Sequence, residues 1–235
     1  MTASTEDSDK IDDRDAFARV GRAGLIAVIR AASPEEAVRA AGALLEGGIP
    51  AIELTFSTPG AVEALAEVRR RHGDDVLIGV GTIREPAQAA AAARAGAAFL
   101  VSAYLRHDIL AAMIETGLPV APGVFTPSEV AQALDAGARV VKLFPASTGG
   151  PSHLRALHGP FPGLRVIPTG GIGIDDLRAW FDAGALAVGI GGELTPRALM
   201  ADGRWDEITG LARQFAVTVA AARDAGARAR GGRTS

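Results

Sequence analysis

Eight short apolar runs constrain the fold of this chain more than any other feature. In chain order they read AGLIAVIR, GGIPAIELT, DDVLIGVGT, AGAAFLVS, TGLPVAPG, AGARVVKLF, GLRVIPTGG and AGALAVGIGG. Their Val, Ile, Leu and Ala residues follow one another without polar alternation, which is typical of strands buried on both faces by helices. The runs therefore predict parallel strands covered by helices.

The segments between the runs favour helices, because they are rich in Ala, Leu, Glu and Arg. Several open with Ser or Thr followed by Pro, at 33–34, 58–59 and 126–127, which is the pattern of an N-cap and a first helical residue. Several end at glycine, as at Gly48 and Gly137. Eight strand-helix units in 235 residues predict an α/β fold, the (β/α)8 TIM barrel, whose typical length is about 250 residues.

A doubly wound open sheet is the alternative fold, but it needs a Gly-rich dinucleotide turn after its first strand, and VIRAASPEE has none. Because no Pro-, Gly- or Ser-rich linker divides the chain, we expect a single domain. We expect the barrel over residues 13–225, between flexible tails at 1–12 and 226–235. An extra amphipathic N-terminal helix over 12–23 is expected to close the bottom of the barrel.

Composition excludes several functional classes. The net charge is −3, the pI is near 5.8, and no basic run carries interleaved aromatics, so we expect no nucleic-acid partner. No apolar run approaches 18 residues and there is no cysteine, so we expect no membrane partner and a cytoplasmic location. The four histidines lack metal-ligand spacing, so we expect no metal and no cofactor.

One lysine inside an apolar run suggests covalent chemistry. Of 24 basic residues only Lys10 and Lys142 are lysines, and Lys142 lies within ARVVKLFPAS. Arginine stays charged, whereas a desolvated lysine can lose its proton and attack a carbonyl carbon. Active sites of such barrels lie at the C-terminal ends of the strands, where this run ends. Lys142 is therefore predicted to be a nucleophile.

Other strand ends carry residues suited to the same chemistry. Glu53 interrupts the buried run PAIELTF and is a candidate general acid/base, or else a structural partner of Lys142 or Arg30. Arg30 ends the first run, either as a fork for a carboxylate or phosphate or as an ordinary rim arginine. The Gly-rich ends PTGGIG and VGIGGEL are typical of phosphate binding by backbone N–H groups.

Taken together, these motifs resemble the 2-keto-3-deoxy-6-phosphogluconate (KDPG) / 4-hydroxy-2-oxoglutarate (KHG) aldolase family. The likeness extends over about residues 24–194 and rests on GGIPAIELTFSTP, IGVGTI, AGAAFLVSAYL, PGVFTPSE, VVKLFPAS, HGPFPGLRVIPTGGI and AVGIGGEL, in family order. It implies a metal-independent class I aldolase on a TIM barrel, assembled as a homotrimer.

The resemblance also implies roles for individual residues. Lys142 forms a Schiff base with pyruvate, and Glu53 moves protons during its formation and during C–C cleavage. Thr82 with the Gly81 backbone holds the pyruvate carboxylate, and Phe144 packs on the pyruvyl group. Thr169 is the hydroxyl near the departing aldehyde, and Gly170 and Gly171 form the phosphate cradle. The expected substrate-binding set is completed by strand-end residues: Arg30, Thr55, Pro122, Gly191 and Gly192.

Two positions depart from the family pattern. Some members carry a substrate-binding arginine where this chain has Ser57, and Arg30 is the candidate replacement. The family's phosphate-binding serine is Gly192 here, followed by Glu193. The missing hydroxyl at Gly192 and the added carboxylate of Glu193 both disfavour a bound phosphate. The departures leave open whether the substrate is phosphorylated.

The expected reaction is cleavage of KDPG to pyruvate and glyceraldehyde 3-phosphate, and/or of KHG to pyruvate and glyoxylate. The partner is thus a small 2-keto acid, and 2-keto-3-deoxy-6-phosphogalactonate is an alternative substrate. A phosphosugar isomerase or epimerase is a second hypothesis, with Lys142 as an electrostatic group and Glu53 as the base. A non-catalytic barrel that binds keto acids is the third.

Overall fold

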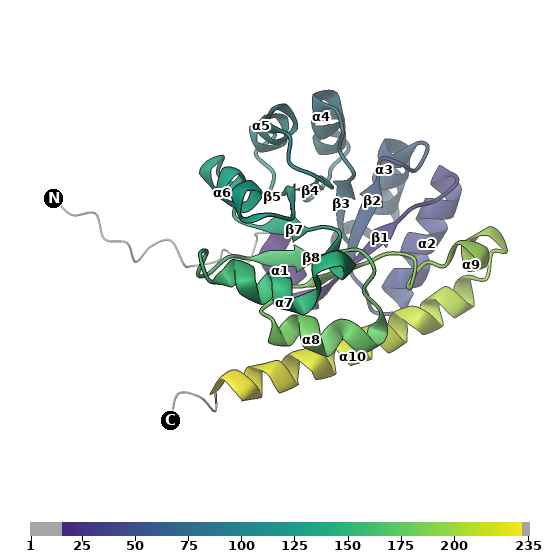
Figure 1. Cartoon of the computed structure of the whole chain (residues 1–235). Coiled ribbons are helices and arrows are strands. Elements are labelled where there is room, and N and C mark those ends of the chain that lie inside the picture. The colour runs from purple at the N-terminus through teal and green to yellow at the C-terminus, as the bar shows by residue number, and fades with distance from the viewer. Residues whose placement is uncertain (1–15, 232–235) are drawn as a thin grey trace.

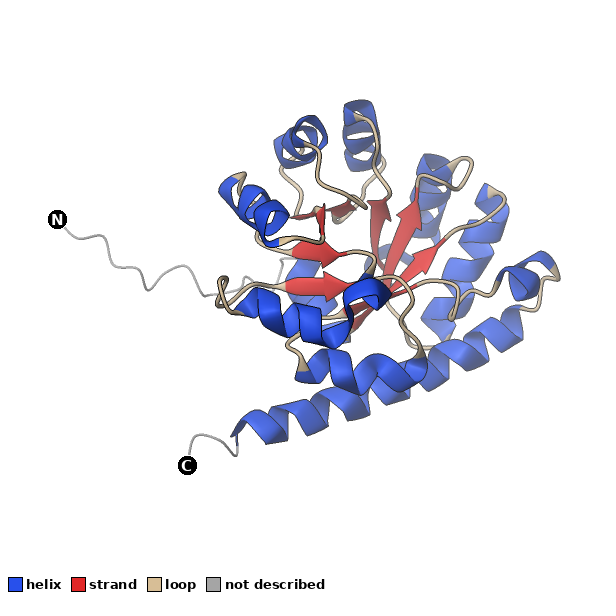
Figure 2. Cartoon of the chain, in the orientation of Figure 1, coloured by secondary structure: helices blue, strands red, loops and turns tan. Residues whose placement is uncertain are grey.

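Short parallel strands form a curled sheet with helices around its outside (Figures 1 and 2). The computed structural model describes residues 16–231, with side chains to residue 223. The strands are β1 (Leu25–Ile29), β2 (Ala51–Thr55), β3 (Leu77–Gly81), β4 (Leu100–Val101), β5 (Val120–Ala121), β6 (Gly123–Val124), β7 (Val141–Leu143), β8 (Val166–Pro168) and β9 (Val188–Ile190). All their pairings are parallel, as the apolar runs predict.

We had expected one closed eight-stranded barrel. The backbone hydrogen bonds between strands instead form two separate sheets. One sheet has the order β5-β4-β3-β2-β1-β9 and the other β6-β7-β8. They separate at Pro122, which has no N–H to donate and lies between β5 and β6 in one apolar run. Between the edge strands β8 and β9, a single isolated parallel bridge pairs Thr169, directly after β8, with Gly189 in the middle of β9.

Helices α2 to α6 lie around the outside of the strands, and α7, α8 and α10 lie along the remaining side (Figure 1). The helices are α1 (Ala16–Ala23), α2 (Pro34–Glu46), α3 (Ala61–His72), α4 (Pro86–Arg94), α5 (His107–Glu115), α6 (Pro127–Asp135), α7 (Ala146–His158), α8 (Leu177–Asp182), α9 (Arg197–Ala201) and α10 (Trp205–Gly231), with short 3₁₀ turns at Gly73–Asp75 and Ile174–Asp176.

Two of the three predicted Ser/Thr-Pro caps are confirmed. Ser33 caps α2 and Thr126 caps α6, each accepting the N–H of a glutamate three residues later. The third, at Thr58, is wrong, because its hydroxyl accepts the N–H of Ala31 at 3.0 Å instead. α3 then begins after Gly60, whose φ of 61° is left-handed.

The strands are buried on both faces. Their outward side chains, such as Leu25, Ala27 and Ile29, pack against the helices in the larger apolar cluster. Their inward side chains, from Ile26 to Ala187, form a second cluster inside the curl, together with Phe17 and other residues of α1. The extra helix therefore packs against the inner face of the strands over its described residues, whereas 12–15 lie outside them.

The structure describes only part of the two terminal segments. The first predicted tail, 1–12, lies outside the described residues, and α10 continues past position 226 to Gly231. α10 packs along α2 and α8, where the Thr209 hydroxyl donates to the Ala43 carbonyl at 3.1 Å. None of the helices within the described residues is long and apolar enough to cross a membrane.

Gly79 tests the inner packing, because a Cβ at this position would lie 2.4 Å from the Phe99 ring. We expect Gly79→Ala to lower the free energy of unfolding by about 1–3 kcal/mol, since the core cannot yield without shifting side chains. Gly42→Ala is the matched control: Gly42 lies in α2 with nothing within 4 Å of such a Cβ. It should stabilise by about 0.5–1 kcal/mol. Urea denaturation measures both, and a Gly79→Ala protein as stable as the parent would contradict this packing.

Candidate active site

A buried lysine-glutamate pair lies inside the curled sheet. Lys142 on β7 and Glu53 on β2 are 3% and 2% exposed. The Lys142 Nζ donates to both Glu53 carboxylate oxygens, at 3.2 Å and 3.3 Å. β2 and β7 belong to different sheets, so only the curl brings these side chains together. Pairing also resolves the cost of burying a cation in an apolar strand, because each charge compensates the other.

The space around this pair is small and mostly apolar. A cavity of about 10 Å³ is lined by the pair together with Ile26, Val101, Ala121, Ile167, Thr169 and Gly189. Such a volume holds about one water molecule. The inner cluster around α1 fills the interior on the N-terminal side of the strands. The pair is therefore approachable from the C-terminal ends of the strands.

Two glycines, Gly81 on β3 and Gly189 on β9, leave room for polar side chains of the adjacent segments. A Cβ at Gly81 would lie 1.8 Å from Glu53 Oε1, and one at Gly189 would lie 2.3 Å from Thr169 Oγ1. No larger residue fits either position without moving the functional side chain beside it. Gly81 was expected at the site for its backbone, whereas the structure adds a steric reason that the sequence does not reveal.

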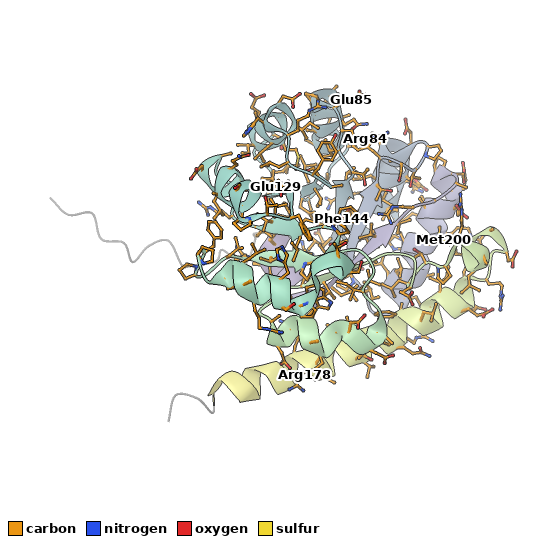
Figure 3. The ribbon with its side chains drawn as sticks, in the orientation of Figure 1. Arg84, Glu85, Glu129, Phe144, Arg178 and Met200 are labelled. Carbon is orange, nitrogen blue, oxygen red and sulfur yellow. The ribbon has the colours of Figure 1, made fainter. Side chains whose placement is uncertain are left out.

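An aromatic ring and a glycine turn lie beside the lysine. The centroid of the Phe144 ring is 5.6 Å from Lys142 Nζ, and a Cβ at Gly170 would be 3.0 Å from that ring. Phe144 lies near the centre of the molecule in Figure 3. Gly170 and Gly171 both have positive φ, of 96° and 67°, and the Ser147 N–H donates to the Gly170 carbonyl at 3.0 Å. The turn is thus fixed against the start of α7.

Thr82 adopts a strained backbone conformation directly after β3. Its φ of 59° makes it the single non-glycine residue with positive φ in the described part of the chain. For such a residue this conformation costs about 1–2 kcal/mol. Strain of this kind concentrates at functional sites. The half-buried Thr82 therefore fits its predicted place at the mouth of the site.

Hydroxyls at the end of β2 hold the end of β1. Thr55 donates to the Ile29 carbonyl at 3.0 Å and shares a 2.7 Å hydrogen bond with Ser57, while Thr58 accepts from Ala31. Because Thr55 is fully buried, its hydroxyl is engaged within the protein. Pro122 is likewise buried, and its carbonyl accepts the Lys142 N–H at 2.9 Å. Both residues position the strand ends in this structure.

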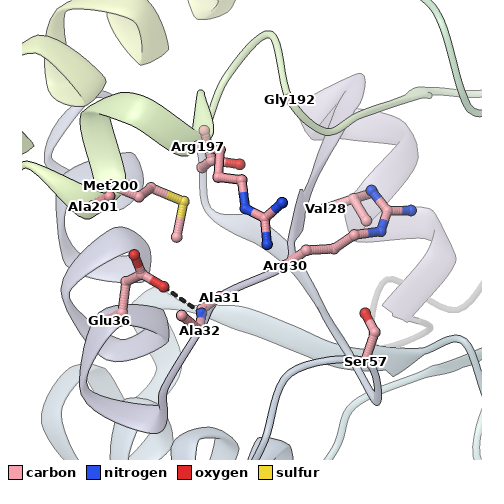
Figure 4. A pocket seen from close by; sticks show the side chains of 11 residues that line it. Val28, Arg30, Ala31, Ala32, Glu36, Ser57, Gly192, Arg197, Met200 and Ala201 are labelled. Atoms are coloured by element: carbon pink, nitrogen blue, oxygen red, sulfur yellow. Dashed lines mark hydrogen bonds between the residues drawn. The ribbon is translucent and has the colours of Figure 1, made fainter.

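A larger pocket opens at the ends of β1 and β9 (Figure 4). It has a volume of about 450 Å³ and brings together Arg30, Ser57 and Gly192, the predicted arginine and both positions that depart from the family pattern. Gly191 adjoins it, since a Cβ there would be 3.2 Å from Arg30 Nη1. The pocket is completed by Val28, Ala31, Ala32, Glu36, Thr195, Arg197, Met200 and Ala201.

The sequence reasoning missed Arg197 and its neighbours on α9. A signal was present, because Thr195-Pro196 repeats the Ser/Thr-Pro pattern that starts other helices and so indicates a helix directly after the last strand. Glu193, which raised doubt about anion binding, is exposed and is not among the residues that line the pocket. Among the described residues, no group of three or more acidic or histidine side chains is placed to hold a metal.

This arrangement is suited to imine chemistry. A primary amine buried beside a carboxylate can attack a carbonyl carbon once its proton has moved, and the carboxylate can accept and return protons. The apolar surroundings and the single open side limit the access of water. An anionic substrate group fits the rim, where Arg30 and Arg197 lie.

Comparisons with known proteins agree with this chemistry. The family model described as KDPG and KHG aldolase matches residues 17–211. A 2-dehydro-3-deoxy-phosphogluconate aldolase from Treponema pallidum is 37% identical over 199 residues, covering 84% of this chain and 94% of the relative. A 2-dehydro-3-deoxy-6-phosphogalactonate aldolase from Escherichia coli K12 is 34% identical over 171 residues, covering 72% and 83%.

A solved structure shows the same likeness in three dimensions. KDPG aldolase from Legionella pneumophila, crystallised with pyruvate captured at low pH as a covalent carbinolamine intermediate, superposes with a TM-score of 0.78 at 33% identity. The match covers 87% of this chain and 98% of that one. With the family model and these relatives spanning most of its length, this chain belongs to the KDPG and KHG aldolase family of lyases.

Proposed function

We propose that this protein is a class I aldolase in which Lys142 forms the Schiff base and Glu53 moves the protons. The observation that carries the proposal is the buried contact of 3.2 Å between Lys142 Nζ and Glu53. The substrates are KDPG, giving pyruvate and glyceraldehyde 3-phosphate, and/or KHG, giving pyruvate and glyoxylate. The phosphogalactonate isomer is the alternative substrate, supported by the name of the Escherichia coli relative.

The reaction begins with proton transfer from the Lys142 ammonium to the Glu53 carboxylate. The free amine attacks C2 of the keto acid, and the proton that the attacking nitrogen loses passes to the new alkoxide, which gives a neutral carbinolamine. Glu53 then protonates the departing hydroxyl, which leaves as water and gives a protonated imine. A desolvated pair 3.2 Å apart needs little motion for these transfers.

Cleavage follows from the protonated imine. Glu53, again a carboxylate, removes the proton from the C4 hydroxyl, the C3–C4 bond breaks, and its electron pair moves through C3 and C2 to the imine nitrogen. The aldehyde leaves, and the resulting enamine is protonated at C3 and hydrolysed to pyruvate and free Lys142. Both bond changes use one base and one amine, which agrees with the residues buried at this site.

The residues that bind the other groups of the substrate are assigned from their positions near Lys142 and Glu53. Gly81 and Thr82 hold the carboxylate, because they lie at the end of β3 beside Glu53. Phe144 packs on the pyruvyl group, since its ring faces the lysine. Thr169 lies beside the aldehyde, because its side chain borders the cavity of the pair. The positive-φ turn at Gly170 and Gly171 presents the N–H groups for an anion.

The finer points of the architecture belong to the same proposal. A complete (β/α)8 barrel is supported by the single apolar run that holds β5 and β6, and by the bridge between Thr169 and Gly189. One domain over 13–225 is supported by the core clusters, which draw on residues from α1 to α10. A homotrimer follows from the family resemblance, and a cytoplasmic location from the composition.

Pyruvate with borohydride tests the nucleophile. We expect reduction to trap a covalent adduct on Lys142, located by peptide mass spectrometry. Lys142→Arg should give no adduct and no measurable turnover, because arginine stays charged and cannot form an imine. Circular dichroism checks that this variant is folded. Turnover retained by a folded Lys142→Arg protein would favour the isomerase or epimerase hypothesis instead.

Glu53→Gln tests the proton-transfer role separately. We expect kcat to fall by about 10²–10⁴-fold, the usual contribution of a general acid/base, while pyruvate binding persists. Glu63→Gln is the control, since Glu63 is an exposed glutamate in α3. Pyruvate release from a 2-keto-4-hydroxy acid is the measurement. A Glu53→Gln enzyme that keeps the parental kcat would remove Glu53 from the mechanism, and a parent without turnover would favour a silent binding barrel.

A further inference from the structure

We propose that Arg197 on α9 acts with Arg30 to supply the side-chain donors for the anionic group at the far end of the substrate, in addition to the backbone N–H groups assigned to Gly170 and Gly171. The inference rests on the proposed aldolase function and names the residue that selects its substrate. The group is the phosphate of a six-carbon substrate or the distal carboxylate of 4-hydroxy-2-oxoglutarate. Both are oxyanions that an arginine fork can bind.

The position of the pocket follows from strand register. Ile26 and Gly189 line the cavity that holds Lys142, and Val28 and Gly191, two residues farther along the same strands, lie at the larger pocket. Two residues advance a strand by about 6–7 Å toward its C-terminal end. The larger pocket therefore lies two residues closer to the C-terminal ends of the strands than the cavity around Lys142, on the side from which the substrate enters.

The pocket carries net positive charge, because two guanidiniums share it with one carboxylate. Within the described residues, neither Arg30 nor Arg197 makes a hydrogen bond or an ion pair. The acidic lining residue, Glu36, already accepts the Ala32 N–H, as Figure 4 shows. Other exposed arginines form ion pairs, as Arg178 does with Asp182. Two free guanidiniums in one pocket of about 450 Å³ form a site for an oxyanion.

The same pocket contains both positions where family donors are missing. Ser57 has a short side chain that hydrogen-bonds Thr55, and Gly192 has none, so both leave space in the pocket. In Figure 4 the Arg197 side chain extends from α9 into the space between Gly192 and Arg30. Arg197 and Arg30 thus supply donors where the hydroxyl and guanidinium of other members are absent. The departures change how the anion is bound and do not remove its site.

The test compares Arg197→Ala with the parent on three substrates: a 2-keto-3-deoxy-6-phosphohexonate, 4-hydroxy-2-oxoglutarate, and unphosphorylated 2-keto-3-deoxygluconate. We expect KM to rise about tenfold or more for an anion-ended substrate, the loss of one hydrogen bond to a charged group, with a much smaller change in kcat. KM for the uncharged-end substrate should stay within about twofold. Arg197→Lys should recover part of the loss, because it restores the charge without the fork.

Arg178→Ala is the surface control, because Arg178 is exposed on α8 and lies away from Phe144 and Met200 (Figure 3). It should leave all three KM values unchanged. A KM increase confined to the phosphorylated substrate identifies a phosphate site, and one confined to 4-hydroxy-2-oxoglutarate identifies a carboxylate site. Equal increases for all three substrates, or none, would overturn the inference, because charge would then not be what Arg197 recognises.

Inorganic phosphate provides a readout that does not depend on turnover. Calorimetric titration should give a dissociation constant about tenfold weaker for Arg197→Ala than for the parent. Identical affinities would count against the site. Pyruvate trapping on Lys142 separates the two proposals: trapping with no effect of Arg197 rejects only this site, whereas a phosphate site without trapping rejects the aldolase mechanism.

Discussion

The ion pair between Lys142 and Glu53 is the interaction on which the rest of this structure depends. It joins strands of different sheets across the curl, and both charges are almost fully removed from water. Such burial is tolerable only while the partners stay together, because one unpaired charge would cost several kcal/mol, on the order of 3–5. Gly81 and the apolar inner cluster are arranged around this requirement. In the proposed mechanism, the same closeness lets a proton move between the two groups.

The strands and most helices could be predicted because their signals are local. An unbroken apolar run indicates a strand buried on both faces, and Ser33 and Thr126 cap helices whatever the tertiary context. Thr58 failed as a predicted cap because its hydroxyl serves Ala31, a residue on another strand's end. The split at Pro122 was also missed, since the change of pairing partner depends on β4 and β7, which no local pattern describes.

The buried pair was more predictable than the pocket around Arg30. Lys142 and Glu53 stood out because a charged residue in an apolar strand requires a reason. The steric need for Gly81 was hidden, since glycine occurs for many reasons and this one lies across a strand pair. Arg197 was hidden because it follows the last strand in a short helix, among many exposed arginines. Its meaning depends on Arg30 and Gly192, which the fold places in one pocket.

The most direct measurement of the central claim is a crystal structure of the protein soaked with pyruvate. The account predicts continuous electron density from Lys142 Nζ to C2 of the pyruvyl group, with the Glu53 carboxylate within hydrogen-bond distance and Phe144 against the ligand. Pyruvate bound elsewhere, or bound at this site without a covalent link while Lys142 stays paired with Glu53, would contradict the claim that this lysine is the nucleophile.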